Sequence, residues 1–321
     1  RHASEPMAAA VLLAAAWALD TPYPGLSLAL GLLWGCAPLW TWWGSRPTAS
    51  LMGPMAWLRI GLADDTQPPS VAERRMLAAL ARDTWRFFER CVSAQDHHLP
   101  PDNLQTAPHP ILAHRTSPTN IGLYLLSAAC ARRFGWIDTT DLLTRLEATL
   151  GTLRQMQRHR GHFLNWYDTR TLAPLLPMYV STVDSGNLSG HLLAVAQACR
   201  EWALATERPA ESARLLALAE AFEPLACEAD FSFLYDRRRH LLHIGHRVAD
   251  GLPDPACYDL LASESRLASL LAIAKGDVPL RHWTALGRPA CAVGSTAGLR
   301  SWSGSMFEYF MPGLVLDEPE G

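Results

Sequence analysis

The sequence lacks the short motifs that mark several common enzyme classes. It contains no GxSxG pattern, no P-loop and no Rossmann glycine pattern, which removes support for a serine hydrolase or a nucleotide-binding enzyme. It has no HExxH motif, and the pairs His159/His162 and His243/His246 each lack a third ligand of matching placement. We therefore expect no metal and no cofactor.

Charge of either sign is also sparse. Charged residues make up 18% of the chain, and 28 basic against 31 acidic residues leave a net charge of −3. Because the basic residues are dispersed, there is no stripe to follow a phosphate backbone, and we expect no nucleic-acid partner. The seven cysteines form no CxxC pair, and their odd number and scattered spacing indicate a reducing compartment.

Two N-terminal runs contain no charged residue at all. Residues 26–43 reach the roughly 18–20 residues that cross a bilayer and predict a transmembrane helix, whereas 7–19 predict only a partial span. Arg1 and Arg46 flank the outer ends of this pair, so the positive-inside rule places the domain that follows in the cytoplasm. We predict a transmembrane region at 1–46 with the lipid bilayer as partner, followed by a Pro-rich linker at 47–70.

From residue 71 onward the apolar residues repeat with a helical period. A charged turn between two apolar runs predicts one β-hairpin at 232–248. Paired amphipathic helices suit a mainly α fold, a partial (α/α)6 toroid spanning 71–321, although periodicity alone equally allows an α-solenoid. The predicted helices cover 71–92, 119–134, 139–158, 187–206, 211–228, 258–275 and 303–315.

Polar and aromatic side chains gather in and after the long loop 159–186. Sugars are bound by aromatic faces that stack on their C–H surfaces and by polar side chains that satisfy their hydroxyls. The alternative is that Asp184 or Ser185 caps a helix starting near Asn187 and that Trp166 belongs to the core. The candidate sugar-binding residues here are Trp166, Tyr167, Asp168, Asp184, Asn187 and His191.

Two carboxylates stand in otherwise apolar helical patterns, Glu264 and Glu308. A charge in such a setting is costly unless it is hydrogen-bonded or has chemical work to do. Glycoside cleavage needs two carboxyl groups across the scissile bond. The alternatives are an Asp259 cap with Glu264 paired to Arg266, and a surface position for Glu308.

Five blocks of the chain occur in the order 114–127, 160–169, 179–188, 258–264 and 306–309. Together they resemble the glucoamylase-like middle region of cyclic β-1,2-glucan synthases. The apolar residues 7–43 are similar to the membrane helices that precede this region in such synthases. Further polar and aromatic residues in or beside the blocks are candidate substrate contacts: Asn120, Asn165, Tyr258, Asp259, Arg266, Trp302, Glu308 and Tyr309.

The resemblance implies part of a large protein of the bacterial inner membrane. In that family a glycosyltransferase region builds linear β-1,2-glucan, an (α/α)6 region cyclises it by retaining transglycosylation, and a phosphorylase-like region trims it. The implied partners are therefore linear β-1,2-glucan and the other two regions of the same parent chain. By its motif, Glu264 resembles the family's general acid/base.

The family's nucleophile belongs to a Trp-Gly-Ile-Ser-Glu-type motif about forty residues beyond the Phe-Glu-Tyr block. Gly321 lies only 13 residues after Glu308, so the resemblance implies a C-terminally incomplete domain that is inactive by itself, with Glu308 lining the site. Two alternatives remain open: a membrane-tethered β-glucan-binding module without catalysis, and an exo-acting glucosidase.

Overall fold

The computed structural model of the chain describes residues 36, 68–293 and 296–317. The predicted spans 7–19 and 26–43, and most of the predicted linker, lie outside the described residues. Within the described ranges, no helix combines the length and the apolar character needed to cross a membrane. The residues from Pro69 to Asp317 form one compact unit.

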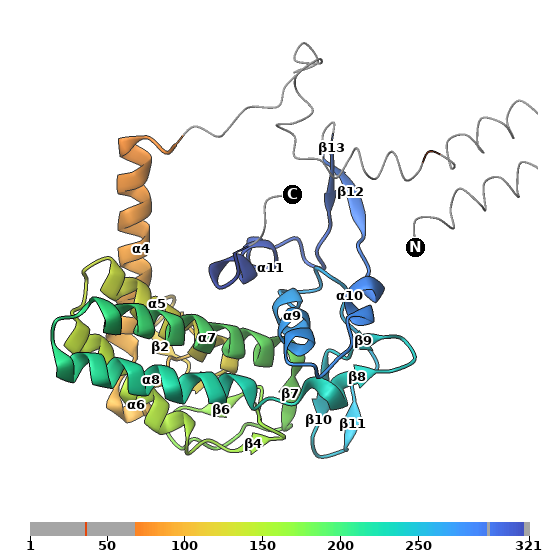
Figure 1. Ribbon diagram of the computed structural model, residues 1–321, viewed down its shortest axis with the longest axis horizontal. Helices are drawn as coiled ribbons and strands as arrows, with labels where there is room; N and C mark the ends of the chain where they lie inside the picture. The colour runs from red at the N-terminus through yellow and green to blue at the C-terminus, as the bar shows by residue number, and fades with distance from the viewer. Residues whose placement is uncertain (1–35, 37–67, 294–295, 318–321) are drawn as a thin grey trace, which may run out of the picture. The chain divides into compact units, whose positions relative to one another are not determined.

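Helices make up the body of this unit (Figure 1). Each of the seven predicted helical segments contains a helix. The predictions 71–92, 119–134 and 211–228 are confirmed to within two residues at both ends, whereas the other four helices differ from the prediction by five to eight residues at one end. The helices are α4 (Val71–Cys91), α5 (Pro118–Arg133), α6 (Thr139–Leu153), α7 (Thr182–Ala205), α8 (Pro209–Cys227), α9 (Arg266–Ala274), α10 (Arg281–Ala285) and α11 (Met306–Phe310). Single 3-10 turns are η3 (Ala94–Asp96), η4 (Phe231–Leu234) and η5 (Pro312–Leu314).

The helix starts follow local capping chemistry. Ser70 and Glu73 form a reciprocal capping box at the start of α4, and Ser117 caps α5 just ahead of a proline at its first position. The start of α7 differs from the expectation. Its cap is Ser181, whose side chain accepts a hydrogen bond from the backbone N–H of Asp184, so neither Asp184 nor Ser185 is the cap and the helix begins five residues before Asn187.

The predicted helix 258–275 is also shorter than expected, because α9 begins only at Arg266. The residues before it turn, with Ser263 at φ 51° and the Asp259 carboxylate accepting a hydrogen bond from the backbone N–H of Leu261. A positive φ is incompatible with a continuous right-handed helix. Glu264 therefore lies on a turn directly before α9.

Helix α7 is the centre of the packing and contacts α5, α8 and α9. Its side chains Leu188, Val195 and Ala196 are almost fully buried. Helices α5, α7 and α9 form one contacting row, while α6 and α8 contact each other and also pack against α5 and α7 respectively. Figure 1 shows α5, α7 and α8 running side by side. This alternation of two rows is the helix pairing of an α/α toroid.

The strands are short, antiparallel and placed between the helices. The predicted hairpin at 232–248 is confirmed as the β8–β9 pair, and β10 continues from it to pair with β7 and β11. The other pairs are β1–β2, β3–β6, β4–β5 and β12–β13. The strands are β1 (Leu104–Gln105), β2 (Ile111–Leu112), β3 (Arg115–Thr116), β4 (Arg158–His159), β5 (His162–Phe163), β6 (Tyr167–Asp168), β7 (Tyr179–Ser181), β8 (Tyr235–Asp236), β9 (Leu241–Leu242), β10 (Gly245–Arg247), β11 (Leu252–Pro253), β12 (Ala290–Val293) and β13 (Thr296–Leu299).

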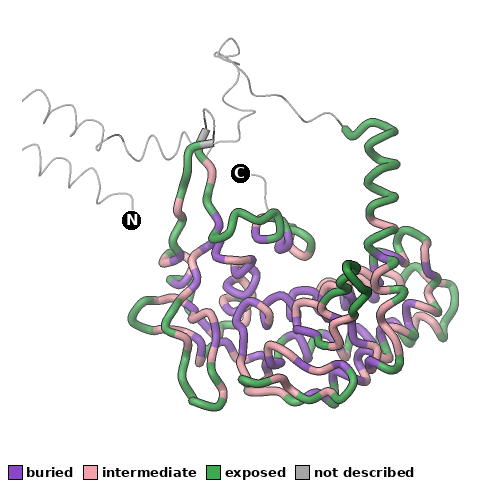
Figure 2. The backbone as a smooth tube through the Cα atoms, turned by 180° about the vertical axis from the view of Figure 1, so that it is seen from behind, coloured by how far each residue is buried: buried purple, intermediate pink, exposed green. Residues whose placement is uncertain are grey.

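Burial is uneven along the unit. The first turns of α4 expose Met76, Leu77 and Leu80, whereas Trp85 further along the same helix is 2% exposed. Figure 2 shows this exposed stretch of α4 projecting from the buried region. The packed core therefore extends from the second half of α4 through α9, and this is the part that holds the polar residues described below.

The contact between α7 and α9 depends on Gly186, because a Cβ at this position would overlap the backbone and side chain of Ala268. We expect Gly186→Ala to lower the free energy of unfolding by about 1–3 kcal/mol through overpacking. Gly151→Ala in α6 is the matched control, since its Cβ would meet no heavy atom within 4 Å, and it should stabilise by about 0.4–1 kcal/mol. Denaturant unfolding measures both, and equal effects of the two variants would contradict the close approach.

Candidate functional site

The side chain of Glu264 is buried between α7 and the turn before α9. It is 6% exposed, and each carboxylate oxygen accepts one hydrogen bond. Asn187 on α7 donates to Oε1 over 2.8 Å, and the hydroxyl of Ser263 donates to Oε2 over 2.6 Å. These two donors come from different segments, so they fix the plane of the carboxylate. Glu264 is not paired with Arg266 by any ion pair within the described residues.

Asn187 connects Glu264 to a second acid through a hydroxyl on α5. Its amide nitrogen also donates to Oγ1 of Thr119 over 3.0 Å, and Thr119 donates to Oδ1 of Asp184 over 2.5 Å. The amide of Asn165, oriented so that both of its ends are satisfied, donates to Oδ2 of Asp184 over 3.0 Å. The first turns of α5 and α7 and the turn before α9 therefore share one polar network.

Burial governs the electrostatics of this network. Loss of hydration raises the pKa of Asp184, although hydrogen bonds from Ser181 and Thr119 oppose the rise. Burial likewise raises the pKa of Tyr258, and the charges of Asp184 and Glu264 add to the effect. The Asn187 carbonyl oxygen Oδ1 is buried without a hydrogen-bond partner among the described residues. An acceptor of this kind is available to a hydroxyl group.

An aromatic pair lies beside the network. The ring of Tyr258 packs against that of Trp302 with centroids 5.6 Å apart and planes tilted by 36°. The Trp302 indole N–H donates to Asp259 over 3.3 Å, while the residue as a whole remains 54% exposed. An exposed indole held by its own N–H is a suitable surface for the C–H face of a sugar.

A side-chain to backbone hydrogen bond connects the segment around Glu264 with the segment around Glu308. Arg266, directly after the Glu264 turn, donates to the carbonyl oxygen of Tyr309 over 2.7 Å. The Tyr309 hydroxyl in turn accepts from the Ser301 N–H and donates to the carbonyl oxygen of Leu299. Arg266 and Tyr309 therefore hold the segment 299–309 against the start of α9.

Glu308 is buried and its carboxylate is occupied by serines. It is 5% exposed, and its Oε2 accepts from the hydroxyls of Ser301 and Ser303 and from the backbone N–H of Ser305, which is the cap of α11. Burial by itself would raise the pKa of Glu308, but these hydrogen bonds outweigh burial and hold the pKa at about 2. Glu308 is thus an ionised capping residue and not a surface glutamate.

Several other candidate residues lie outside this network. The Tyr167 hydroxyl is fully buried and bonded to the backbone of Gln157 and Leu164. Asp168 closes a turn by accepting from the N–H groups of Arg170 and Thr171. Burial by itself would raise the pKa of Asp168, but these hydrogen bonds together outweigh burial and lower the pKa.

The remaining candidates make contacts of their own. Trp166 packs under the guanidinium of Arg115, 5.0 Å from the ring centroid. Asn120 contacts Asp102 over 3.4 Å. His191 lies one turn beyond Asn187 on α7. Its Nδ1 donates to the backbone carbonyl oxygen of Asn187 over 2.5 Å, and its Nε2 is buried without a partner among the described residues.

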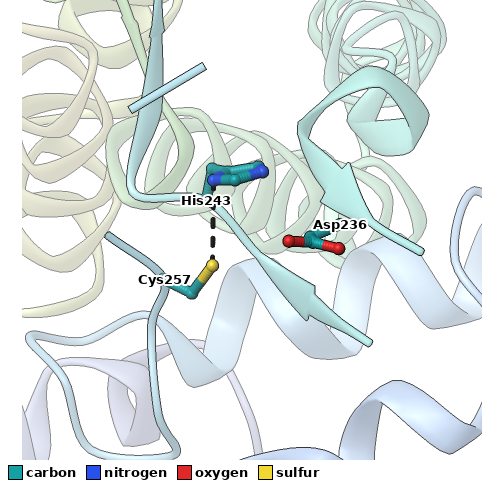
Figure 3. A group of neighbouring side chains, drawn as sticks. All are labelled: Asp236, His243 and Cys257. Carbon is teal, nitrogen blue, oxygen red and sulfur yellow. Dashed lines mark hydrogen bonds between the residues drawn. The ribbon is translucent and has the colours of Figure 1, made fainter. Parts of the chain in front are cut away.

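Sequence reasoning missed Thr119 and Ser263, which hold the network together. Both lie inside the blocks that carried the resemblance, but hydroxyl residues are too common for such a role to be read from sequence. It also missed a group in which Asp236, His243 and Cys257 come together (Figure 3). The ligand atoms of that group come from three separate strand segments, so no spacing along the chain marks it.

The paired helices give the described unit the α/α-toroid fold of glucoamylase-like structures. A protein assigned as a glucoamylase from Bacteroides caccae has a TM-score of 0.56 at 17% identity, with 73% of this chain and 57% of that chain covered. An endo-beta-1,2-glucanase from Chitinophaga pinensis, solved with sophorotriose and glucose, has a TM-score of 0.54 at 14% identity, covering 70% and 54%. At these identities the similarity establishes the fold.

Sequence comparison identifies a particular relative. The chain is 37% identical over 432 aligned positions to the cyclic beta-(1,2)-glucan synthase NdvB of Rhizobium meliloti (strain 1021), with 98% of this chain covered. The resemblance to cyclic β-1,2-glucan synthases is thereby confirmed. The matched region spans 15% of the relative's length. No family model matches the chain.

The folded-state pKa of Glu308 lies below its ordinary value, so its ionisation stabilises the fold at neutral pH. This contribution is fully present above about pH 4.5 and is lost as the pH falls toward about 2. We expect Glu308→Gln to be less stable than the wild type at pH 7, with the difference shrinking as the pH falls through this window. The unfolding free energies of the two proteins, measured from pH 7 to pH 2.5, test this.

Glu220→Gln on the exposed face of α8 is the control and should differ little from the wild type at every pH. A stability gap for Glu308→Gln that stays constant with pH would contradict the serine-stabilised carboxylate.

Proposed function

We propose that the described domain acts on β-1,2-glucan and that its chemistry is the retaining transglycosylation that closes a linear β-1,2-glucan into a ring. Support comes from the similarity to the Rhizobium synthase, which is named for a cyclic β-1,2-glucan product, and from the β-1,2-glucanases that share the fold. The observation that carries the proposal is the buried Glu264 carboxylate, oriented by Asn187 and Ser263.

In this proposal Glu264 is the general acid/base. It gives a proton to the departing glycosidic oxygen and then takes one from the hydroxyl of the same chain that attacks the glycosyl-enzyme. A hydroxyl replaces water as acceptor, so one glycosidic bond breaks and one forms with no net hydrolysis. Fixing the carboxylate plane from two sides favours this role, because proton transfer requires close and directed approach.

The nucleophile of the retaining pair is proposed to come from the motif that the family carries beyond the Phe-Glu-Tyr block. Glu308 is a poor candidate for it. Its carboxylate is occupied by Ser301, Ser303 and Ser305, and a pKa of about 2 makes it a weak nucleophile. We assign Glu308 instead to holding the loop that carries Trp302.

The sugar-binding surface is proposed to consist of the Tyr258–Trp302 pair and the amide and carboxyl groups beside it. Trp302 offers an exposed face, and the unpartnered Oδ1 of Asn187 can accept from a glucose hydroxyl. Asp184 and Asn165 complete the polar side of this surface. Three further proposals rest on the sequence alone. A membrane region lies next to the domain, the domain faces the cytoplasm, and the chain is part of a parent protein with other regions.

The catalytic role of Glu264 is tested in a parent-length protein that includes the second carboxylate. Glu264→Gln should lower formation of cyclic glucan by about 10²- to 10⁴-fold, since this is the contribution of a positioned general acid/base. Binding of linear β-1,2-glucan, measured by calorimetry, should stay close to that of the wild type because the amide preserves shape and hydrogen bonding. Product analysis by mass spectrometry separates rings from free glucose.

The control Glu220→Gln should form rings at the wild-type rate. An unchanged rate in Glu264→Gln would remove the catalytic assignment. Glucan binding with no product from the parent-length wild type would favour the binding module instead, and free glucose would favour an exo-acting glucosidase.

The stacking surface is tested on the chain itself. Trp302→Ala should weaken binding of linear β-1,2-glucan by roughly 5- to 30-fold, the effect of losing about 1–2 kcal/mol of apolar contact. Phe134→Ala, which removes a comparably exposed aromatic ring at the far end of α5, should leave the dissociation constant unchanged. Calorimetric titrations of both variants provide the comparison, and equal losses would argue against a stacking surface at Trp302.

A further inference from the structure

The group formed by Asp236, His243 and Cys257 lies outside the polar network of Glu264 and serves no role in the proposed chemistry. One potential ligand atom from each residue lies within 4.8 Å of the other two. Figure 3 shows the thiol of Cys257 and the carboxylate of Asp236 beside the imidazole of His243. Carboxylate, imidazole and thiol are the three side-chain types that bind zinc in proteins.

The strand register explains why these side chains meet. Asp236 pairs directly with Leu241 across the β8–β9 hairpin, and His243 follows Leu241 by two residues, so both share one face of the strands. His243 forms an antiparallel bridge with Cys257 on its other side, which places the thiol on that face as well. Backbone pairing on both edges of residues 241–243 therefore arranges the three groups before any ligand arrives.

The spacing between the thiol and the imidazole suits a small metal ion. The Cys257 sulfur lies 3.7 Å from Nδ1 of His243, and two ligands of a tetrahedral zinc site with ordinary bond lengths are about 3.5 Å apart. Oδ1 of Asp236 accepts from the N–H groups of Arg238 and Arg239, which fixes the carboxylate. Its Oδ2 has no hydrogen bond within the described residues and is available as a ligand.

The charge around the group permits a divalent ion. An ionised Asp236 and a Cys257 thiolate together supply two negative charges, which balance a dication. The guanidinium of Arg239 is a nearby positive charge, and it donates a hydrogen bond to the carbonyl oxygen of Pro255. Asp254 lies on the same side and adds negative potential at the thiol.

A reactive thiol is the competing explanation, because a cysteine next to a histidine can serve as a nucleophile. Reactive cysteines have a lowered pKa. Burial instead raises the pKa of Cys257, with Arg239 opposing and Asp236 and Asp254 adding to the rise.

We propose that Asp236, His243 and Cys257 form a binding site for a divalent zinc-like metal ion, with one coordination position left for water. Mixed sulfur, nitrogen and oxygen ligands favour Zn²⁺ over Mg²⁺ or Ca²⁺, which take oxygen ligands. The ion joins β8, the residues after β9 and the segment that leads from Cys257 into Tyr258. It therefore stabilises the approach to the Glu264 turn without contacting the sugar.

Cobalt titration of the full 321-residue chain, first freed of metal with a chelator, tests the site directly. We expect one Co²⁺ per chain, with the near-ultraviolet band of a cobalt–thiolate bond and the visible bands of tetrahedral geometry, all removed by added Zn²⁺. Cys257→Ser should abolish the thiolate band, and Cys227→Ser, which changes an exposed cysteine at the end of α8, should keep it. Absence of the band in the wild type, or its persistence in Cys257→Ser, overturns the proposal.

Two further variants separate binding from folding. His243→Ala and Asp236→Asn should each weaken Zn²⁺ binding by more than about 100-fold, since even the loss of an outer partner of a ligand costs 10- to 100-fold. Far-ultraviolet circular dichroism of the metal-free variants identifies any that fail to fold. Wild-type affinity in folded His243→Ala overturns the assignment of that ligand and, with it, the site.

A measurement on the wild type alone covers the case in which the variants unfold. Iodoacetamide labelling followed by mass spectrometry should show that Zn²⁺ protects Cys257 and leaves the exposed Cys130, Cys227 and Cys291 as reactive as before. Equal labelling of Cys257 with and without Zn²⁺ overturns the proposal. None of these readouts depends on glucan chemistry, so the site and the proposed function stand or fall separately.

Discussion

The hydrogen bond between Asn187 and Glu264 is the contact around which the rest of the site is organised. It requires α7 and the start of α9 to approach closely, and Gly186 makes that approach possible because any side chain there would meet Ala268. Once the two segments are in contact, Asn187 is buried and its amide must be satisfied locally. Its amide nitrogen donates to Glu264 on one side and to Thr119 on the other, while its Oδ1 has no partner among the described residues. The close packing of the two helices therefore also fixes the position of the Glu264 carboxylate.

Much of the helical framework could be predicted from the sequence, because it depends on local patterns. The apolar period located α4, α5, α6 and α8 to within a few residues at most ends. The exceptions are instructive. The start of α7 reads as a polar loop, since Thr182, Asp184 and Ser185 are unusual in a buried helix, yet each finds a partner in a distant segment. A positive φ at Ser263, which no period reveals, delays the start of α9.

The candidate site could be predicted only in part from the sequence, because its contacts join residues that are far apart along the chain. Glu264 and Asn187 are separated by 77 positions, and Thr119 and Asp184 by 65. Residue type alone indicated that an Asn or an Asp could bind sugar, and it selected Tyr167 and Asp168 as readily as Asp184. The structure assigns Tyr167 to the core and Asp168 to a turn. The ligand group at Cys257 shows the same limit, since strand register brings its members together.

The two glutamates differ in the hydrogen-bond donors around them and not in how deeply they are buried. Glu264 and Glu308 are exposed to almost the same small extent. Glu308 accepts hydrogen bonds from Ser301, Ser303 and Ser305, all within seven positions of it in the sequence, which satisfies the carboxylate and keeps it ionised. Among the described residues, Glu264 accepts one bond at each oxygen, from Asn187 and Ser263. The smaller number of donors at Glu264 fits the general acid/base role proposed for it, which requires exchange of a proton, whereas the donors around Glu308 fit a carboxylate that holds a loop in place. The different roles proposed for Glu264 and Glu308 therefore follow from the number and origin of the hydrogen-bond donors around each carboxylate.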